Sequence, residues 1–139
     1  MSLSVLKRLL LSGLAILVAW TAIDVLMHRF VLRTLYDENS GLWRPLDQLN
    51  IALIYVVTVI LIATLVATYW LLVKPKSSGS GVCLGAFMGL ALGISSGFGS
   101  YIHMPIPLAL AWGWLIGGTL KGIAAGAIVG LLIKEPGNP

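Results

Sequence analysis

The sequence predicts an all-α integral membrane protein in which four transmembrane helices form a bundle. Of its 139 residues, 58% are hydrophobic and 10% are charged, and the mean hydropathy is +0.98. Such a chain has too few polar residues to cover a water-soluble domain. The apolar residues also gather in four segments, each long enough to cross a hydrocarbon core of roughly 30 Å at about 1.5 Å per residue.

The four segments define a single transmembrane domain, residues 1–139. The helices are expected over residues 9–35, 50–73, 82–102 and 108–133. Lys7 and Arg8 precede the first apolar run, as they do in a secretory signal. Cleavage after Ala22 would place the bulky Trp20 where signal peptidases need a small residue, so we expect a retained helix.

The connections between the segments differ in character. Residues 37–49 contain three acids, a glycine and a proline and are expected to form a loop. Residues 74–81 read KPKSSGSG, which indicates a flexible polar linker. In residues 103–107, HMPIP, two prolines predict a tight turn that ends the third helix and begins the fourth.

The distribution of positive charge predicts that both termini are cytoplasmic. With the N-terminus inside, the cytoplasmic ends carry five basic residues: Lys7, Arg8, Lys74, Lys76 and Lys134. The opposite ends carry three, Arg29, Arg33 and Arg44, diluted by acids. Because the basic residues, apart from Lys121, are scattered at segment ends, we expect no nucleic-acid partner.

Two glycine series predict close packing of the third and fourth helices. The series are Gly85, Gly89, Gly93 and Gly97, and Gly118, Gly122, Gly126 and Gly130. A spacing of four residues keeps glycines near one helix face, where missing side chains let another backbone approach. We therefore expect an antiparallel pair joined as a glycine zipper, and these faces also suit a homodimer. Smooth faces that slide or line a pore are the functional alternative.

Asp24 and Lys121 stand out because both lie within apolar segments. A charge at bilayer depth costs several kcal/mol unless it is paired or hydrated. The lysine side chain tilts toward the N-terminus of its helix, which brings its ammonium group to the depth of Asp24. We therefore predict an ion pair between the first and fourth helices.

His28 and Thr21 extend this polar face of the first helix, because they lie at i+4 and i−3 from Asp24. We expect a buried polar cluster of Asp24, His28, Lys121 and Thr21. An Asp–His pair is able to relay protons or hold a ligand. The alternative is a cluster of hydrogen bonds that only fixes helix packing.

Other polar residues suggest weaker sites. Arg29 and Arg33, at i and i+4, suit contact with an anion or a lipid headgroup, or pairing with Asp37. His28 and His103 are the two histidines of the chain, too few for a metal centre, and the single Cys83 excludes an internal disulfide. We expect no metal, no other cofactor and no catalytic residue. The outer half of the bundle also holds small polar side chains: Asn50, Thr58, Ser95, Ser96 and Ser100.

Several short motifs resemble a family of small uncharacterised bacterial membrane proteins. They are Asp24-x-x-x-His28, Leu35-Tyr36, Leu42-Trp43-Arg44-Pro45 and Met104-Pro105-Ile106-Pro107, followed by the glycine-rich second half. The resemblance implies four helices in the bacterial cytoplasmic (inner) membrane. It implies no activity and no roles for individual residues.

The sequence favours a non-enzymatic protein, an accessory or assembly component of the membrane whose partners are the lipid bilayer and a larger membrane complex. The alternative is a small oligomeric transporter or proton-coupled carrier that uses Asp24, His28 and Lys121. Four helices barely enclose a pathway, so a carrier of this size would need an oligomer. A membrane enzyme or a haem protein is a third possibility.

Overall fold

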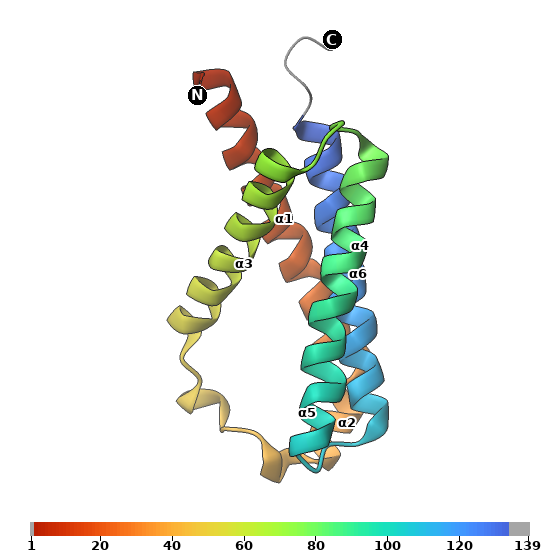
Figure 1. Ribbon diagram of the computed structural model, residues 1–139. Helices are drawn as coiled ribbons and strands as arrows, with labels where there is room; N and C mark the ends of the chain where they lie inside the picture. The colour runs from red at the N-terminus through yellow and green to blue at the C-terminus, as the bar shows by residue number, and fades with distance from the viewer. Residues whose placement is uncertain (1, 134–139) are drawn as a thin grey trace.

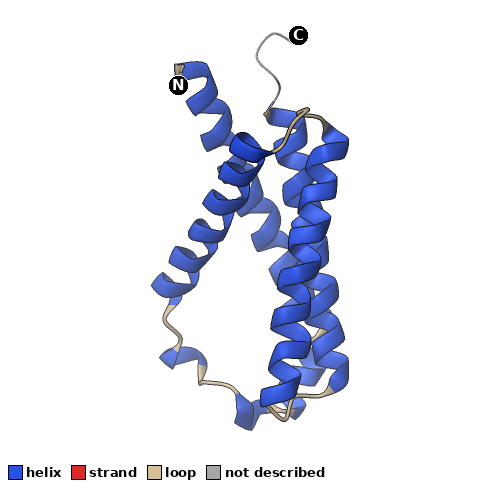
Figure 2. Ribbon diagram, viewed as in Figure 1, coloured by secondary structure: helices blue, strands red, loops and turns tan. Residues whose placement is uncertain are grey.

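The computed structural model describes residues 2–133, which form helices and loops without a strand (Figure 2). Within these residues, four helical stretches are long and apolar enough to cross a membrane: Leu3–Val31, Ile51–Leu72, Ser78–His103 and Leu108–Leu132. The predicted all-α class is confirmed. Lys134, which entered the predicted orientation, lies outside the described residues.

The first stretch starts earlier than the predicted residue 9 and contains a break. Helix α1 (Leu3–Leu26) begins after Ser2, whose side chain accepts a hydrogen bond from the Val5 amide. It continues as a π-helical turn, η1 (Met27–Val31), closed by a bond from the Leu32 amide to the Met27 carbonyl. Leu32 then leaves helical geometry, and the short helix α2 (Arg33–Glu38) follows. The predicted continuous helix to residue 35 is therefore interrupted at Leu32.

The predicted loop after α2 contains two short 3₁₀ turns, η2 (Ser40–Leu42) and η3 (Leu46–Gln48). Helix α3 (Ile51–Leu72) begins after Asn50, because the Asn50 side chain accepts a hydrogen bond from the Leu53 amide. Asn50 is therefore the N-terminal cap of α3.

The predicted flexible linker over residues 74–81 is wrong in its second half. Helix α4 (Ser78–Ile94) already includes Ser78 to Gly81, because Ser77 and Ser80 form a reciprocal capping box. The helix continues through a second π-helical turn, η4 (Ser95–Gly99), into α5 (Ser100–His103). After the predicted turn, α6 (Leu108–Leu132) begins at the residue that follows Pro107.

Helices α4 and α6 lie side by side along their whole length and run antiparallel (Figure 1). A Cβ atom added to Gly89 would lie 2.7 Å from the Gly118 carbonyl oxygen and 2.9 Å from the Gly122 Cα. One added to Gly85 would meet the backbone of Gly122 and Gly126. Each step toward the C-terminus of α4 thus meets an earlier residue of α6, and backbone touches backbone without side chains between them.

Helix α1 and the turn η1 pack on another face of α6, where Gly113 leaves room for Leu32. A Cβ atom on Gly113 would overlap Leu32, and one on Gly117 would lie 3.6 Å from Met27. The main apolar core lies toward the end of α6 that is farther from Gly113 and Gly117, and it joins α1, α3 and α6. Its fully buried members are Ile16, Tyr69, Ala125 and Val129.

The first half of α3 leans away from α4 and α6, as Figure 1 shows. Exposed apolar side chains cover it on all sides, including Ile51, Ile54, Val57 and Ile60, which are 48–58% exposed. Only from Ile62 onward does α3 bury side chains against the bundle. An apolar surface of this extent on an isolated chain indicates that something apolar covers it.

We predict that Gly85→Ala separates α4 from α6. The added methyl group has no space beside the Gly122 and Gly126 backbone, so the free energy of unfolding should fall by about 1–3 kcal/mol. Unfolding in mixed micelles, followed by circular dichroism, measures the change. Gly79→Ala in the same helix is the matched control, because its methyl group would meet only the Ser77 hydroxyl, at 3.8 Å. Equal stability of the two variants would contradict the packing.

Candidate functional site

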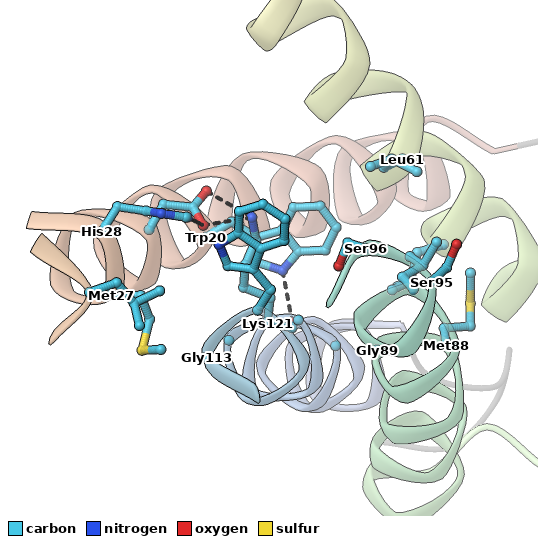
Figure 3. Close-up of a pocket in the computed structure, with 18 of the residues that line it drawn as sticks. Trp20, Met27, His28, Leu61, Met88, Gly89, Ser95, Ser96, Gly113 and Lys121 are labelled. Atoms are coloured by element: carbon cyan, nitrogen blue, oxygen red, sulfur yellow. Dashed lines mark hydrogen bonds and ion pairs between the residues drawn. The ribbon is translucent and has the colours of Figure 1, made fainter. Parts of the chain in front are cut away.

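The predicted ion pair between α1 and α6 is confirmed. Lys121 Nζ lies 2.7 Å from Asp24 Oδ2 and 2.8 Å from Oδ1, so both carboxylate oxygens accept from the same ammonium group (Figure 3). Lys121 is near the middle of α6, roughly 16–20 Å from either end of that helix. Charge-assisted hydrogen bonds of this length are the strong ones.

Trp20, one turn before Asp24 on α1, contacts Lys121 in two ways. Its indole N–H donates to the Lys121 carbonyl oxygen at 2.8 Å, and the lysine ammonium lies 4.9 Å from the centre of its ring. The Trp20 ring therefore covers a side of the ammonium group that Asp24 does not, and an aromatic face attracts a cation. Trp20 is only 5% exposed, so this contact fixes the position of the ion pair from the core side.

A row of polar contacts, two of them hydrogen bonds, leads from the ion pair toward α2. His28 Nε2 lies 3.9 Å from Asp24 Oδ1, and His28 Nδ1 lies 2.7 Å from the Tyr36 hydroxyl. Trp114 Nε1 donates to the same hydroxyl at 2.6 Å. Because Trp114 only donates, the Tyr36 oxygen accepts from it and its proton is free for His28 Nδ1. This assignment leaves the imidazole proton on Nε2, toward Asp24.

Tyr36 belongs to α2, beyond the long apolar stretch, and is packed among aromatic rings. Its ring lies 5.5 Å from that of His28 and 5.3 Å from that of Trp43, measured between centroids. Burial raises the pKa of the Tyr36 hydroxyl above its usual value of 10.0; the hydrogen bond from Trp114 opposes this rise. The hydroxyl is therefore protonated at neutral pH and available as a donor.

The polar cluster is less buried than the sequence predicts. The Lys121 side chain is 23% exposed, but Asp24 is 42% and His28 48% exposed. Part of this exposure faces a cavity of about 630 Å³ between α1, α3, α4 and α6. Its polar lining comprises Asp24, His28, Thr64, Ser95, Ser96 and Lys121, and its apolar lining includes Leu61, Leu65, Met88 and Leu92.

Both π-helical turns contribute to this cavity. Met27 and His28 come from η1, and Ser95 and Ser96 come from η4. A π-helical turn inserts one residue into a helix, which shifts the side chains that follow, and such turns are frequent at functional sites. The break after η1 also returns α2 toward the bundle, where Tyr36 reaches His28.

Thr21 does not belong to the cluster. Its hydroxyl donates to the Leu17 carbonyl at 2.8 Å, one turn back on the same helix. The side chain is exposed and lines a separate hollow with Val25 and Tyr55. The prediction failed because a threonine within a helix satisfies its own hydroxyl in this way without a tertiary partner.

The two arginines predicted to contact an anion or a lipid headgroup, Arg29 and Arg33, are exposed on η1 and α2. Arg33 Nε lies 3.5 Å from Asp37 Oδ2, with both side chains at least 70% exposed, so the predicted alternative of pairing with Asp37 holds for Arg33. For Arg29, contact with an anion or a lipid headgroup stays a prediction.

The remaining polar candidates divide between cavity and surface. Ser95 and Ser96 line the cavity, whereas Asn50 caps α3 and the Thr58 hydroxyl donates to the Ile54 carbonyl. His103 ends α5 and is exposed. Within residues 2–133, no group of three His, Cys, Asp or Glu side chains is placed to hold a metal ion.

Sequence reasoning missed the roles of Trp20, Tyr36 and Trp114. Their positions in the sequence did not assign any of the three to the polar cluster. Spacing along one helix gives no sign that Trp114 on α6 and Tyr36 on α2 share a hydrogen bond. The chain matches no family model, no curated protein and no solved structure.

We predict strong energetic coupling between Asp24 and Lys121. Asp24→Ala and Lys121→Ala should each lower the free energy of unfolding by about 1–3 kcal/mol, because each leaves one charge without a partner. The double variant should lose less than the sum of the two, since no unpaired charge is left. Folded yield and unfolding in micelles provide the measurement.

The exposed Arg33–Asp37 pair serves as the matched control for this cycle. A surface pair contributes between zero and about 1 kcal/mol, so its two alanine variants should be additive. Additive effects at Asp24 and Lys121 as well would show that their close approach carries no stabilising energy.

A second prediction concerns the titration of Tyr36. Tyrosinate absorbance near 295 nm is measured against pH for the wild type and for Tyr36→Phe. The difference between the two curves is the titration curve of Tyr36. That difference should titrate above the usual pKa of about 10, because burial disfavours the phenolate. A Tyr36 titration at or below the usual value would contradict the packing around its hydroxyl.

Proposed function

We propose that this chain is a multi-pass protein of the bacterial cytoplasmic membrane with both termini in the cytoplasm. In this reading it is a non-enzymatic accessory or assembly component that receives another membrane constituent at the Asp24–Lys121 cavity. The family resemblance of its short motifs supports the bacterial location, and the excess of lysine and arginine at one end supports the orientation.

The exposed apolar surfaces support insertion into lipid. Four helical stretches in the described chain are long and apolar enough to cross a bilayer. In water, the exposed side chains on the first half of α3 would be a severe aggregation hazard, whereas in lipid they need no protein partner.

The contact between α4 and α6 supports a glycine zipper as the packing device of the bundle. Lipid provides little hydrophobic drive for helix association, so close backbone approach must supply the attraction. The glycines that face the partner backbone, among them Gly85, Gly89, Gly122 and Gly126, are suited to that task.

The observation that carries the proposed role is the ion pair beside an open cavity. A pair that served only to lock α1 onto α6 needs no cavity beside it, because Asp24 and Lys121 already satisfy each other across the two helices. Here Asp24 remains 42% exposed, and the cavity beside it reaches α3 and α4. The two π-helical turns that line the cavity further favour a working site over a purely structural one.

A second candidate role is a proton-coupled carrier, in an oligomer. The observation that favours it is the row from Asp24 through His28 to Tyr36, with contacts of 3.9 and 2.7 Å. Such a row joins the middle of the bundle to the end where α2 lies, and imidazole and carboxylate groups are the usual members of proton relays. In this reading Asp24→Asn abolishes transport while leaving folded yield intact.

The composition of the native particle tests the accessory role. The protein is extracted from its own membrane into native nanodiscs, and the mass and components of the particle are determined. We expect a second constituent in fixed stoichiometry, and we expect the folded double variant Asp24→Ala, Lys121→Ala to lose it. That loss follows because the variant removes the ion pair from the cavity lining but leaves no unpaired charge.

The control is the double variant Arg33→Ala, Asp37→Ala, which removes an exposed ion pair away from the cavity lining. It should retain the second constituent. A particle that holds only copies of this chain would oppose the accessory role and favour the carrier. Loss of the constituent from both double variants would show that the cavity is not its binding site.

A further inference from the structure

The cavity has the composition of a site for an amphiphilic molecule. Its volume of about 630 Å³ lies within the range of roughly 300–1,000 Å³ that is typical of small-molecule pockets. The charged pair and His28 lie on the side of α1 and α6. On the other side α3 and α4 supply apolar walls through Leu61, Leu65, Met88 and Leu92, and the polar groups there are the hydroxyls of Thr64, Ser95 and Ser96. Figure 3 shows α3 and α4 on the side of the cavity opposite His28.

The charges at the polar side cancel, which argues against an ionic ligand. Asp24 and Lys121 satisfy each other through two hydrogen bonds, and the Trp20 ring faces the ammonium group. A carboxylate or phosphate ligand would have to compete with Asp24 for Lys121, and a cationic ligand would have to compete with Lys121. Either exchange leaves one unpaired charge in an apolar environment, at a cost of several kcal/mol.

Hydrogen-bonding capacity nevertheless remains for a neutral head group. The Asp24 oxygens keep lone pairs beyond the two bonds to Lys121, and His28 Nε2 is 3.9 Å from the nearer one, too far for a good hydrogen bond. The Ser96 hydroxyl donates to the Gly93 carbonyl at 3.3 Å, which leaves its oxygen free to accept. Figure 3 shows Ser96 directed toward Trp20 and Lys121. A hydroxyl group suits Asp24 and His28, because it can donate to an Asp24 oxygen and accept from the Nε2–H of His28, with the Ser96 oxygen as a second acceptor.

We propose that the cavity binds an uncharged, hydroxyl-bearing amphiphile dissolved in the membrane. Its hydroxyl lies by Asp24 and His28, donating to the carboxylate and accepting from the imidazole Nε2–H, and its apolar chain lies against Leu65, Met88 and Leu92. The inference rests on the proposed membrane insertion and names the class of constituent that the cavity receives. A long-chain alcohol is the simplest molecule of this class.

Photocrosslinking with two matched probes tests the proposal. Purified full-length protein is placed in nanodiscs of phosphatidylethanolamine and phosphatidylglycerol with diazirine-bearing hexadecanol or diazirine-bearing hexadecanoic acid. Mass spectrometry locates the labelled residues. We expect the alcohol to label segments 61–65 and 88–96 more strongly than the acid does. Excess unlabelled hexadecanol should reduce this labelling.

A pair of tryptophan variants separates the cavity from the general lipid surface. Met88→Trp fills the cavity from the α4 wall and should reduce labelling by the alcohol by on the order of tenfold. Val57→Trp adds the same side chain to an exposed part of α3 that does not line the cavity, and labelling should persist. Both variants are compared after size-exclusion chromatography, so that only folded protein is scored.

The charge of the site provides an independent readout. Asp24→Asn leaves the Lys121 charge without its partner, so preference should shift from the alcohol toward the acid. If that variant does not fold, the Met88→Trp comparison decides alone. Labelling that hexadecanol does not compete, or that Met88→Trp leaves unchanged, would show ordinary lipid contact and overturn the proposal. Stronger wild-type labelling by the acid would overturn it in favour of an anionic ligand.

Failure of this experiment is distinguishable from failure of the proposed function. A native particle whose second constituent depends on Asp24 and Lys121, together with a cavity that no alcohol labels, would retain the accessory role and reject this ligand class. A particle with this chain alone, together with a competed alcohol site, would reject the accessory role and retain the ligand.

Discussion

The contact of α4 with α6 is the constraint on which the other helix positions depend. Because glycines let the two backbones touch, the two helices form one unit with little room for rotation or sliding. That unit fixes which faces of α6 remain for other helices. The face with Gly113 and Gly117 receives Leu32 and Met27, and Lys121 is thereby presented to Asp24. Helix α3 has no glycine-lined face of its own and is held through its second half, by Ile62, Leu65 and Tyr69.

The ion pair shows how a charge is tolerated near the middle of an apolar helix. Lysine alone at that position would cost several kcal/mol in lipid, and so would aspartate alone. Trp20 contributes to both partners at once, because its N–H binds the Lys121 backbone while its ring faces the ammonium group. The pair nevertheless has an exposed side toward the cavity, which the contact between α1 and α6 does not by itself require. This combination of strong pairing and incomplete enclosure is the physical basis for regarding the region as a working site.

The helices are locally distorted where they meet the cavity. The turns η1 and η4 lie on different helices, yet both supply lining residues. The distortion of α1 has a visible effect, since it brings α2 back to the bundle and places the Tyr36 hydroxyl between His28 and Trp114. Polar groups are thus connected from the middle of the bundle to the start of the loop after α2. Proton coupling would use this connected row, whereas reception of a membrane constituent would use the cavity beside Asp24 and Lys121.

Some properties followed from the sequence alone, because they depend on composition and on spacing along one chain segment. Hydropathy predicted the all-α class and the four long helices, and glycine spacing predicted which helices would touch. The Asp24–Lys121 pair was also predictable, since two opposite charges in apolar segments have few other ways to lower their cost. The helix start at Ser78 was missed because serine and glycine suggest a linker, whereas the Ser77–Ser80 capping box favours a helix. Only the tertiary structure decided that Thr21 leaves the polar cluster, that Trp20 and Tyr36 join it, and that α3 leans away to leave a cavity. These outcomes depend on helix rotation and on the break at Leu32, which are set by contacts between residues far apart in the chain and leave no periodic signal in the sequence.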